Sequence, residues 1–108
     1  MPEKFKIPRQ HSRFNMYQRL FIDKVSSNAK EWNVPTKKVT RLLQLQESWV
    51  KDIEAIPKST VHDHEAVQKR NETLAEFYAE LEFILDYHLL NNENISRADK
   101  LLLGISGF

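Results

Sequence analysis

Residues that break helices are confined to a few places in this chain of 108 residues, and this restriction most constrains its fold. Both glycines lie close to the C-terminus, at positions 104 and 107, and Pro35 and Pro57 are the two prolines between residues 9 and 103. A sandwich or barrel of many short strands needs frequent turns rich in glycine and proline. The sequence therefore argues against that class of fold and predicts three long segments that can each form a helix.

Apolar residues recur at alternating steps of three and four within each segment, which is the spacing of one face of an α-helix. In the first segment this stripe consists of Phe14, Tyr17, Phe21, Val25, Asn28 and Trp32, with Leu20 beside it. In the second segment it consists of Val39, Leu42, Gln46, Trp49, Ile53 and Ile56, with Leu43, Leu45 and Val50 beside it. In the third segment, residues 61–90, it consists of Val67, Asn71, Leu74, Tyr78, Leu81, Leu85 and His88, with Phe77 and Ile84 beside it. Each segment is predicted to be an amphipathic helix.

The residues between the first two stripes are typical of helix ends. Ser12 is expected to be the N-cap of the first helix, which ends at Asn33-Val34-Pro35-Thr36 because the residue before a proline disfavours helical backbone. Pro35 or Thr36 begins the second helix, and Pro57 ends it.

A cap is also predicted for the third helix, and a short fourth helix follows it. Ser59 or Thr60 caps the third helix. After a polar turn, Ser96 caps the fourth helix, and Gly104 ends it in the left-handed conformation that glycine adopts easily. Ile105 is expected to fold back onto this end as its hydrophobic contact.

These elements predict an all-α fold, an up-down-up three-helix bundle with a short fourth C-terminal helix. Residues 1–11, which lack periodicity, form an extended N-terminal arm, and residues 12–108 form a single helical-bundle domain. The side chains expected to be largely buried are Trp32, Leu42, Trp49, Leu74, Tyr78 and Leu81. Asn71 is interpreted as a polar core residue that fixes helix register, and His88 as a boundary residue near a helix end.

Several short motifs occur in order along the chain. They are Ile7-Pro8, Phe14, Val34-Pro35, Thr60, Asn71 with Ala75, and the segment from Ile95 to Ile105. This order resembles a group of bacterial helical proteins of the Bacteroidetes type whose function is not established. The resemblance covers nearly the whole chain and implies a helical bundle, followed in many members by a second, β-rich domain. It implies no activity that can be transferred residue by residue.

The residue types exclude or disfavour several kinds of chemistry. The absence of cysteine excludes disulfides, thiolate metal sites and a cysteine nucleophile. In the metal-like cluster His62-Asp63-His64-Glu65, the two histidines are two positions apart and cannot share one face of a helix, so we expect a solvated first helical turn. A row of acidic residues is expected to be solvated or paired with basic neighbours rather than to act as a general acid and base: Glu72, Glu76, Glu80 and Glu82. We therefore predict no catalytic residue, no metal site and no cofactor.

Charge is unevenly distributed although the net charge is only +1. Residues 1–41 contain ten Lys or Arg and three acidic residues, a net +7, and residues 42–108 contain six and twelve, a net −6. Basic residues of the first helix are expected to face acidic residues of the third helix within one monomer, and the alternative is that the basic face of one copy meets the acidic face of another. These residues are Arg13, Arg19, Lys24 and Lys30, and Glu65, Glu72, Glu76, Glu80, Glu82 and Asp86.

These observations favour a non-enzymatic helical interaction or scaffold module whose partner is another protein. The alternative is a nucleic-acid-associated accessory domain, because basic residues of the arm and first helix interleave with aromatic ones. This basic surface consists of Lys4, Lys6, Arg9, Arg13 and Arg19, interleaved with Phe5, His11, Phe14 and Tyr17. With no apolar stretch long enough to span a bilayer and no apolar stretch typical of a secretory signal, we expect a cytoplasmic location and no membrane contact.

Overall fold

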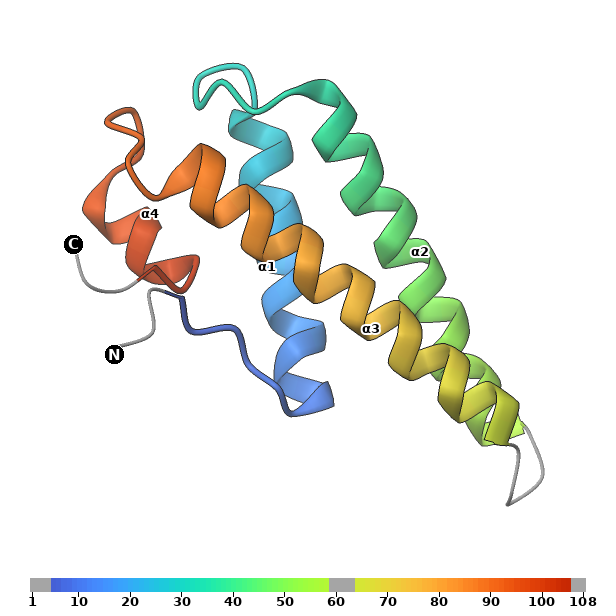
Figure 1. The fold of residues 1–108 in the computed structure, drawn as a ribbon. Coiled ribbons are helices and arrows are strands. Elements are labelled where there is room, and N and C mark those ends of the chain that lie inside the picture. The colour runs from blue at the N-terminus through green and yellow to red at the C-terminus, as the bar shows by residue number, and fades with distance from the viewer. Residues whose placement is uncertain (1–4, 59–63, 106–108) are drawn as a thin grey trace.

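The computed structural model describes residues 5–58 and 64–105, with the backbone alone at 55–58, 64 and 66. Its elements, shown in Figure 1, are α1 (His11–Asn28), α2 (Thr36–Lys58), α3 (His64–Ile84), a π-helical turn (Leu85–Leu89) and α4 (Arg97–Leu102). The three long helices run up, down and up, and α4 lies at one end of the bundle. The predicted all-α fold, a three-helix bundle with a short fourth helix, is confirmed.

The core is centred on Phe14 of α1, which has no exposed surface. Its ring meets the rings of Trp49 on α2 and Phe77 on α3 edge to face, with centroids 5.4 and 5.3 Å apart. The ring of Tyr78 lies 4.9 Å away on the same helix as Phe77. Aromatic pairs in these geometries contribute beyond the area that they bury, so this cluster joins all three long helices at one point.

The predicted core is confirmed for Trp32, Leu42, Trp49 and Leu81. On α3, however, Leu74 and Tyr78 are only half-buried, and Asn71 is exposed, so the interpretation of Asn71 as a core residue is wrong. The buried line of α3 begins instead at Thr73 and Phe77, because that side of the helix contacts α1 and α2. The first part of the predicted stripe, from Val67 to Tyr78, therefore lies at or outside the edge of this contact, whereas Leu81 and Leu85 lie within it.

A π-helical turn interrupts the third helix, which was predicted to be unbroken. The backbone N–H of Leu90 donates to the carbonyl oxygen of Leu85, five residues earlier, at 2.8 Å. The additional residue in this turn shifts the helical register, and Leu85 and Leu89 are both fully buried. His88 is half-buried near the end of this turn, in agreement with its predicted place at a boundary.

The two ends of α1 differ in how well they were predicted. Ser12 lies inside the helix, and Gln10 takes the N-cap position with extended backbone and no side-chain cap bond, so the predicted cap is wrong. At the other end, the N–H of Trp32 still donates to the carbonyl of Asn28 at 2.8 Å. Asn33 then adopts a φ of 57° and ends the helical turns at the predicted place.

The second helix begins at Thr36, one of the two predicted starts, and ends at Lys58, one residue beyond Pro57. The backbone carbonyl of Pro35 accepts the first hydrogen bond of this helix, from Lys38 at 2.9 Å. The predicted caps of the third helix, Ser59 and Thr60, lie outside the described residues.

Both predicted ends of the fourth helix are confirmed. The hydroxyl oxygen of Ser96 accepts a hydrogen bond from the backbone N–H of Asp99 at 3.1 Å. Gly104 has a φ of 89°, and the N–H of Ile105 donates to the carbonyl of Lys100 at 2.9 Å. Ile105 is buried in the core, as expected for the apolar residue that follows this kind of helix end.

The N-terminal arm is pinned to this helix end. Phe5 pairs with Ile105 in an isolated antiparallel bridge, and the N–H of Lys6 donates to the carbonyl of Gly104 at 2.7 Å. Phe5 is half-buried against the core. Segments a hundred positions apart therefore lie side by side.

Two side chains of α1 hold α4 in place. The hydroxyl of Tyr17 donates to the backbone carbonyl of Leu103, and the ammonium of Lys24 lies 3.3 Å from the carboxylate of Asp99. Burial raises the pKa of Tyr17 well above its usual range, so its phenol stays protonated and remains a donor.

A polar network crosses the contact between α1 and α2. Gln18 is fully buried, and its carbonyl oxygen accepts a hydrogen bond from the amide of Gln46 at 2.7 Å. Its own amide donates to Asn15 at 3.1 Å, and the indole N–H of Trp49 donates to the same Asn15 oxygen at 3.3 Å. Both the oxygen and the nitrogen of the buried Gln18 amide therefore have a hydrogen-bond partner. A shift of α1 along α2 would separate Gln18 from Gln46, so this side chain favours one register of the two helices.

We expect Leu81→Ala to lower the free energy of unfolding by about 2–5 kcal/mol, because it removes a fully buried side chain and leaves a cavity. Leu74→Ala, at a half-buried position, should cost less than about 2 kcal/mol. Urea unfolding followed by circular dichroism measures both values. Equal losses for the two variants would contradict this difference in burial.

We also expect Gly104→Ala to destabilise the protein by about 1–3 kcal/mol, because an L-residue is strained at this φ. In addition, a Cβ atom here would lie 2.7 Å from the carbonyl oxygen of Lys6. Lys6→Ala keeps that carbonyl and serves as the control, with an unchanged melting temperature. A Gly104→Ala variant that melts with the wild type would contradict both the backbone strain at residue 104 and the close approach of the Lys6 carbonyl.

Candidate functional site

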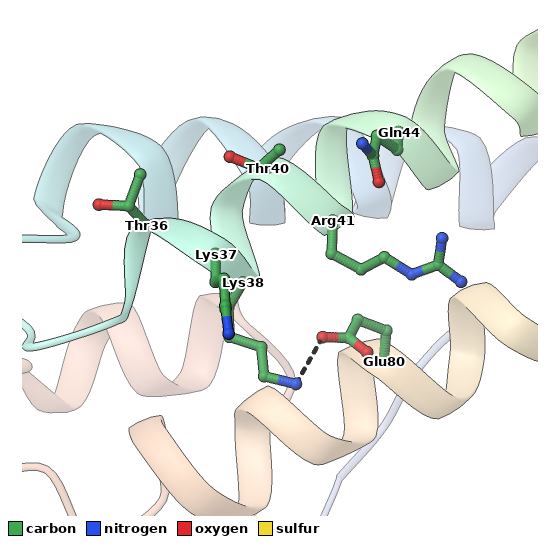
Figure 2. A pocket seen from close by; sticks show the side chains of 7 residues that line it. All are labelled: Thr36, Lys37, Lys38, Thr40, Arg41, Gln44 and Glu80. Atoms are coloured by element: carbon green, nitrogen blue, oxygen red, sulfur yellow. Dashed lines mark ion pairs between the residues drawn. The ribbon is translucent and has the colours of Figure 1, made fainter.

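An open hollow lies over the first turns of α2, beside α3 (Figure 2). Its volume is about 740 Å³. Seven residues line it: Thr36, Lys37, Lys38, Thr40, Arg41, Gln44 and Glu80. We call it the basic hollow, because three of these side chains are cationic and one is anionic.

The local sequence explains how this lining forms. Helix α2 begins directly after Pro35, so Lys37, Lys38 and Arg41 fall within its first two turns. On α3, Glu76 and Glu80 are four residues apart and therefore share one side of that helix. The two helices run antiparallel (Figure 1), and the ion pairs of Glu80 with Lys38 and of Glu76 with Arg41 place this acidic pair opposite the beginning of α2.

Lys38 and Arg41 each form an ion pair across the two helices. The ammonium of Lys38 lies 3.1 Å from the carboxylate of Glu80, and these side chains are only 29% and 17% exposed. Figure 2 shows Lys38 extending from α2 to Glu80. The guanidinium of Arg41 lies 3.5 Å from the carboxylate of Glu76, and these two side chains are 48% and 64% exposed. The first pair is thus better shielded from water than the second.

Two exposed aromatic rings lie next to the basic hollow. Phe83 and Tyr87 stack with centroids 4.4 Å apart, and they are 39% and 71% exposed. The ammonium of Lys38 lies 4.0 Å from the centroid of Phe83, which is close enough for a cation–π contact. Lys38 thereby contacts both the hollow and the stacked pair. We call Phe83 and Tyr87 together the aromatic surface.

Beyond Tyr87 lies a second hollow, of about 410 Å³. Its lining is polar and acidic: Trp32, Asn33, Asp86, Tyr87, His88, Asn91, Asn92, Glu93 and Asn94. Tyr87 thus lines the hollow that contains carboxylates and amides, and it stacks on Phe83, which contacts Lys38 of the basic hollow.

The predicted acidic residues pair with α2 rather than with α1. Glu76 and Glu80 contact Arg41 and Lys38, and Lys24 of α1 contacts Asp99 of α4. Among the described residues, the structure gives no ion pair between α1 and α3, so the expected pairing of these two helices is wrong. The reason is geometric, because α3 runs along α2, whereas its ring contacts with α1 are made at Phe14.

The predicted basic surface is divided among separate places. Lys6, Arg9, Arg13 and Arg19 are exposed, and Lys4 lies outside the described residues. Arg9 lies 5.5 Å from the ring of Tyr78, beside a hollow that also contains Glu82. Arg19 lines another hollow, together with Asp23 and Glu47. Arg9 and Arg19 are therefore not brought into one site.

The aromatic residues interleaved with these cations are largely unavailable for stacking on a base. Phe14 and Tyr17 are buried, and Phe5 is half-buried. The exposed ring of His11 meets the buried ring of Trp49 edge to face, with centroids 5.7 Å apart.

The predicted metal-like cluster falls largely outside what the structure describes. His62 and Asp63 lie outside the described residues, as does the side chain of His64, and Glu65 is exposed. Within the described ranges, no group of three or more His, Cys, Asp or Glu side chains is arranged to hold a metal ion. No helix in these ranges is long and apolar enough to cross a membrane.

The aromatic surface was missed by the sequence analysis. Phe83 and Tyr87 lie off the apolar stripe of the third segment, and they are four residues apart. This spacing places two large rings on an outer face of a helix, and it is the signal that identifies them. Lys38 was missed because its partners, Glu80 and Phe83, become its neighbours only when α2 packs on α3.

Comparison of the chain with protein-family models, with curated proteins and with solved structures gave no match.

We expect a double-mutant cycle on Lys38 and Glu80, with Met and Gln as replacements, to give a coupling free energy of about 1 kcal/mol. The matched cycle on Arg41 and Glu76 should give less than about 0.5 kcal/mol, because that pair is more exposed. Urea unfolding measures both cycles. A larger coupling for the exposed pair would contradict the difference in shielding.

Proposed function

We propose that this chain is a non-enzymatic helical module that binds another protein through the aromatic surface and the adjoining basic hollow. The observation that carries the proposal is the stacked pair Phe83 and Tyr87, whose rings are exposed on a helix instead of being packed in the core. Large aromatic side chains and arginine are enriched where proteins bind one another, and the basic hollow contains Arg41. The cytoplasmic location and monomeric state expected from the sequence belong to the same proposal.

The ordering of these side chains supports the proposal. Phe83 is held between the ammonium of Lys38 and the ring of Tyr87, and Lys38 is held in turn by Glu80. Side chains that are already ordered lose little conformational entropy when a partner binds. The aromatic surface therefore meets a partner in a form that needs little rearrangement.

The runner-up is a nucleic-acid-associated accessory domain that uses Lys4, Lys6, Arg9, Arg13 and Arg19. The observation in its favour is that the four of these residues with a described structure are exposed. Carboxylates beside Arg9 and Arg19 weaken the attraction of a phosphate backbone to these positions. We therefore place this function second.

Site-specific photo-cross-linking tests the proposal in the cells that make the protein. Benzoylphenylalanine is placed at position 87 in one variant and at position 16 in a control, because Tyr87 and Met16 are similarly exposed, at 71% and 74%. We expect a distinct cross-linked protein from position 87 and not from position 16. Phe83→Ser should weaken that cross-link, because it removes the ring on which position 87 stacks.

Two results would contradict the proposal. One is the absence of any cross-link from position 87, and the other is the same products from both positions. Retention of DNA or RNA in a mobility-shift assay, lost as salt rises, would promote the nucleic-acid function instead.

A further inference from the structure

The second hollow, of about 410 Å³, differs from the basic hollow in the charge of its lining, and we call it the acidic hollow. We infer that the acidic hollow receives an arginine side chain of the partner protein, whose guanidinium packs on Tyr87 and is attracted by the carboxylates of Asp86 and Glu93. This inference rests on the proposed function and specifies the partner by its chemistry.

The acidic hollow has no cation of its own to balance its carboxylates. Asp86 and Glu93 both line it, and no described Lys or Arg belongs to its lining. Both residues are exposed, and neither forms an ion pair with any described residue. Two unbalanced carboxylates give the hollow a negative potential, which attracts a cation and repels the phosphates of a nucleic acid.

Tyr87 adds an aromatic face to the same hollow. One face of its ring stacks on Phe83, with centroids 4.4 Å apart, and the residue is still 71% exposed, so the other face is open. Tyr87 lines the acidic hollow together with the two carboxylates. A cation over the face of a tyrosine ring is attracted by the electrons of that ring.

Hydrogen bonds hold the walls of the acidic hollow together. The side-chain amide of Asn92 donates to the carbonyl of Trp32 at 2.7 Å, and that of Asn94 donates to the carbonyl of Glu31 at 3.0 Å. Both acceptors belong to the connection between α1 and α2. Glu93 lies between the two asparagines, so the backbone that carries it is fixed against this connection. A site whose walls are already ordered loses little conformational entropy when a ligand enters.

A guanidinium suits this lining better than an ammonium ion. Its planar group can stack on an aromatic ring while its N–H groups donate to carboxylates at the edge of that plane. The ammonium of a lysine is a compact and strongly hydrated charge, so it gains less from contact with a ring. A hollow of about 410 Å³ is also large enough for one long side chain, since small-molecule pockets begin at about 300 Å³.

Nuclear magnetic resonance titration of the ¹⁵N-labelled protein at low salt tests the inference. The probe is the capped peptide Gly-Arg-Gly. In one control peptide citrulline replaces the arginine, which keeps the shape of the side chain and removes its charge. In the other control peptide lysine replaces the arginine, which keeps the charge and removes the planar group.

We expect the arginine peptide to shift amide signals of residues 32–33 and 86–94, with weak affinity. The citrulline peptide should bind at least about fivefold more weakly and the lysine peptide at least about twofold more weakly, because each lacks one kind of contact. Asp86→Asn combined with Glu93→Gln should weaken the arginine peptide about fivefold, and Tyr87→Leu should weaken it about threefold.

Matched control variants separate this site from a general effect of charge. Asp23→Asn combined with Glu47→Gln removes the same charge from a different hollow, which also contains Arg19 and Lys51. Met16→Leu changes a side chain that is as exposed as that of Tyr87. Both controls should leave the affinity for the arginine peptide unchanged.

The same spectra show whether each variant is folded, because a folded variant keeps the dispersed signals of the wild type. Equal binding of either control peptide, shifts confined to other residues, or an equal loss in the Asp23 and Glu47 variant would each overturn the inference. If the arginine peptide fails to bind but the cross-link from position 87 remains, the arginine specificity is wrong and the interaction module stands. Failure of both experiments overturns both.

Discussion

The contact of Phe14 with three other rings is the interaction on which the arrangement of the helices depends. Phe14 belongs to α1, and its neighbours Trp49, Phe77 and Tyr78 belong to α2 and α3. Because this is where α1 reaches α3, the two helices cross without running alongside each other. Along the rest of its length α3 packs on α2, and the ion pairs of Lys38 and Arg41 form between these two helices.

The helices and much of their buried faces could be predicted from the sequence because the information is local and periodic. Steps of three and four placed Phe21, Val25 and Leu42 in the core, and the residue types at Ser96 and Gly104 identified both ends of α4. These signals act within one or two helical turns, so no knowledge of the other helices was needed.

The features that the sequence did not predict depend on distant parts of the chain. Asn71 has the right spacing for the core, but the crossing of α1 near Phe77 leaves it exposed. The π-helical turn at Leu85–Leu89 changes which side of the chain is buried, and the periodic pattern does not reveal it. The candidate site combines Lys38 with Glu80 and Phe83, and these residues are neighbours only in the folded protein. The sequence did contain one signal for this site, because Phe83 and Tyr87 are two aromatic residues that lie off the apolar stripe of the third segment.

The bridge between Phe5 and Ile105 has a consequence for the connectivity of the fold. Since the first and last described segments lie side by side, the four helices form an almost closed ring of chain. Joining these segments through a few residues and opening the chain elsewhere leaves every helix contact in place, which is the condition for a circular permutation. The order in which the helices are synthesised is therefore separable from the way in which they pack.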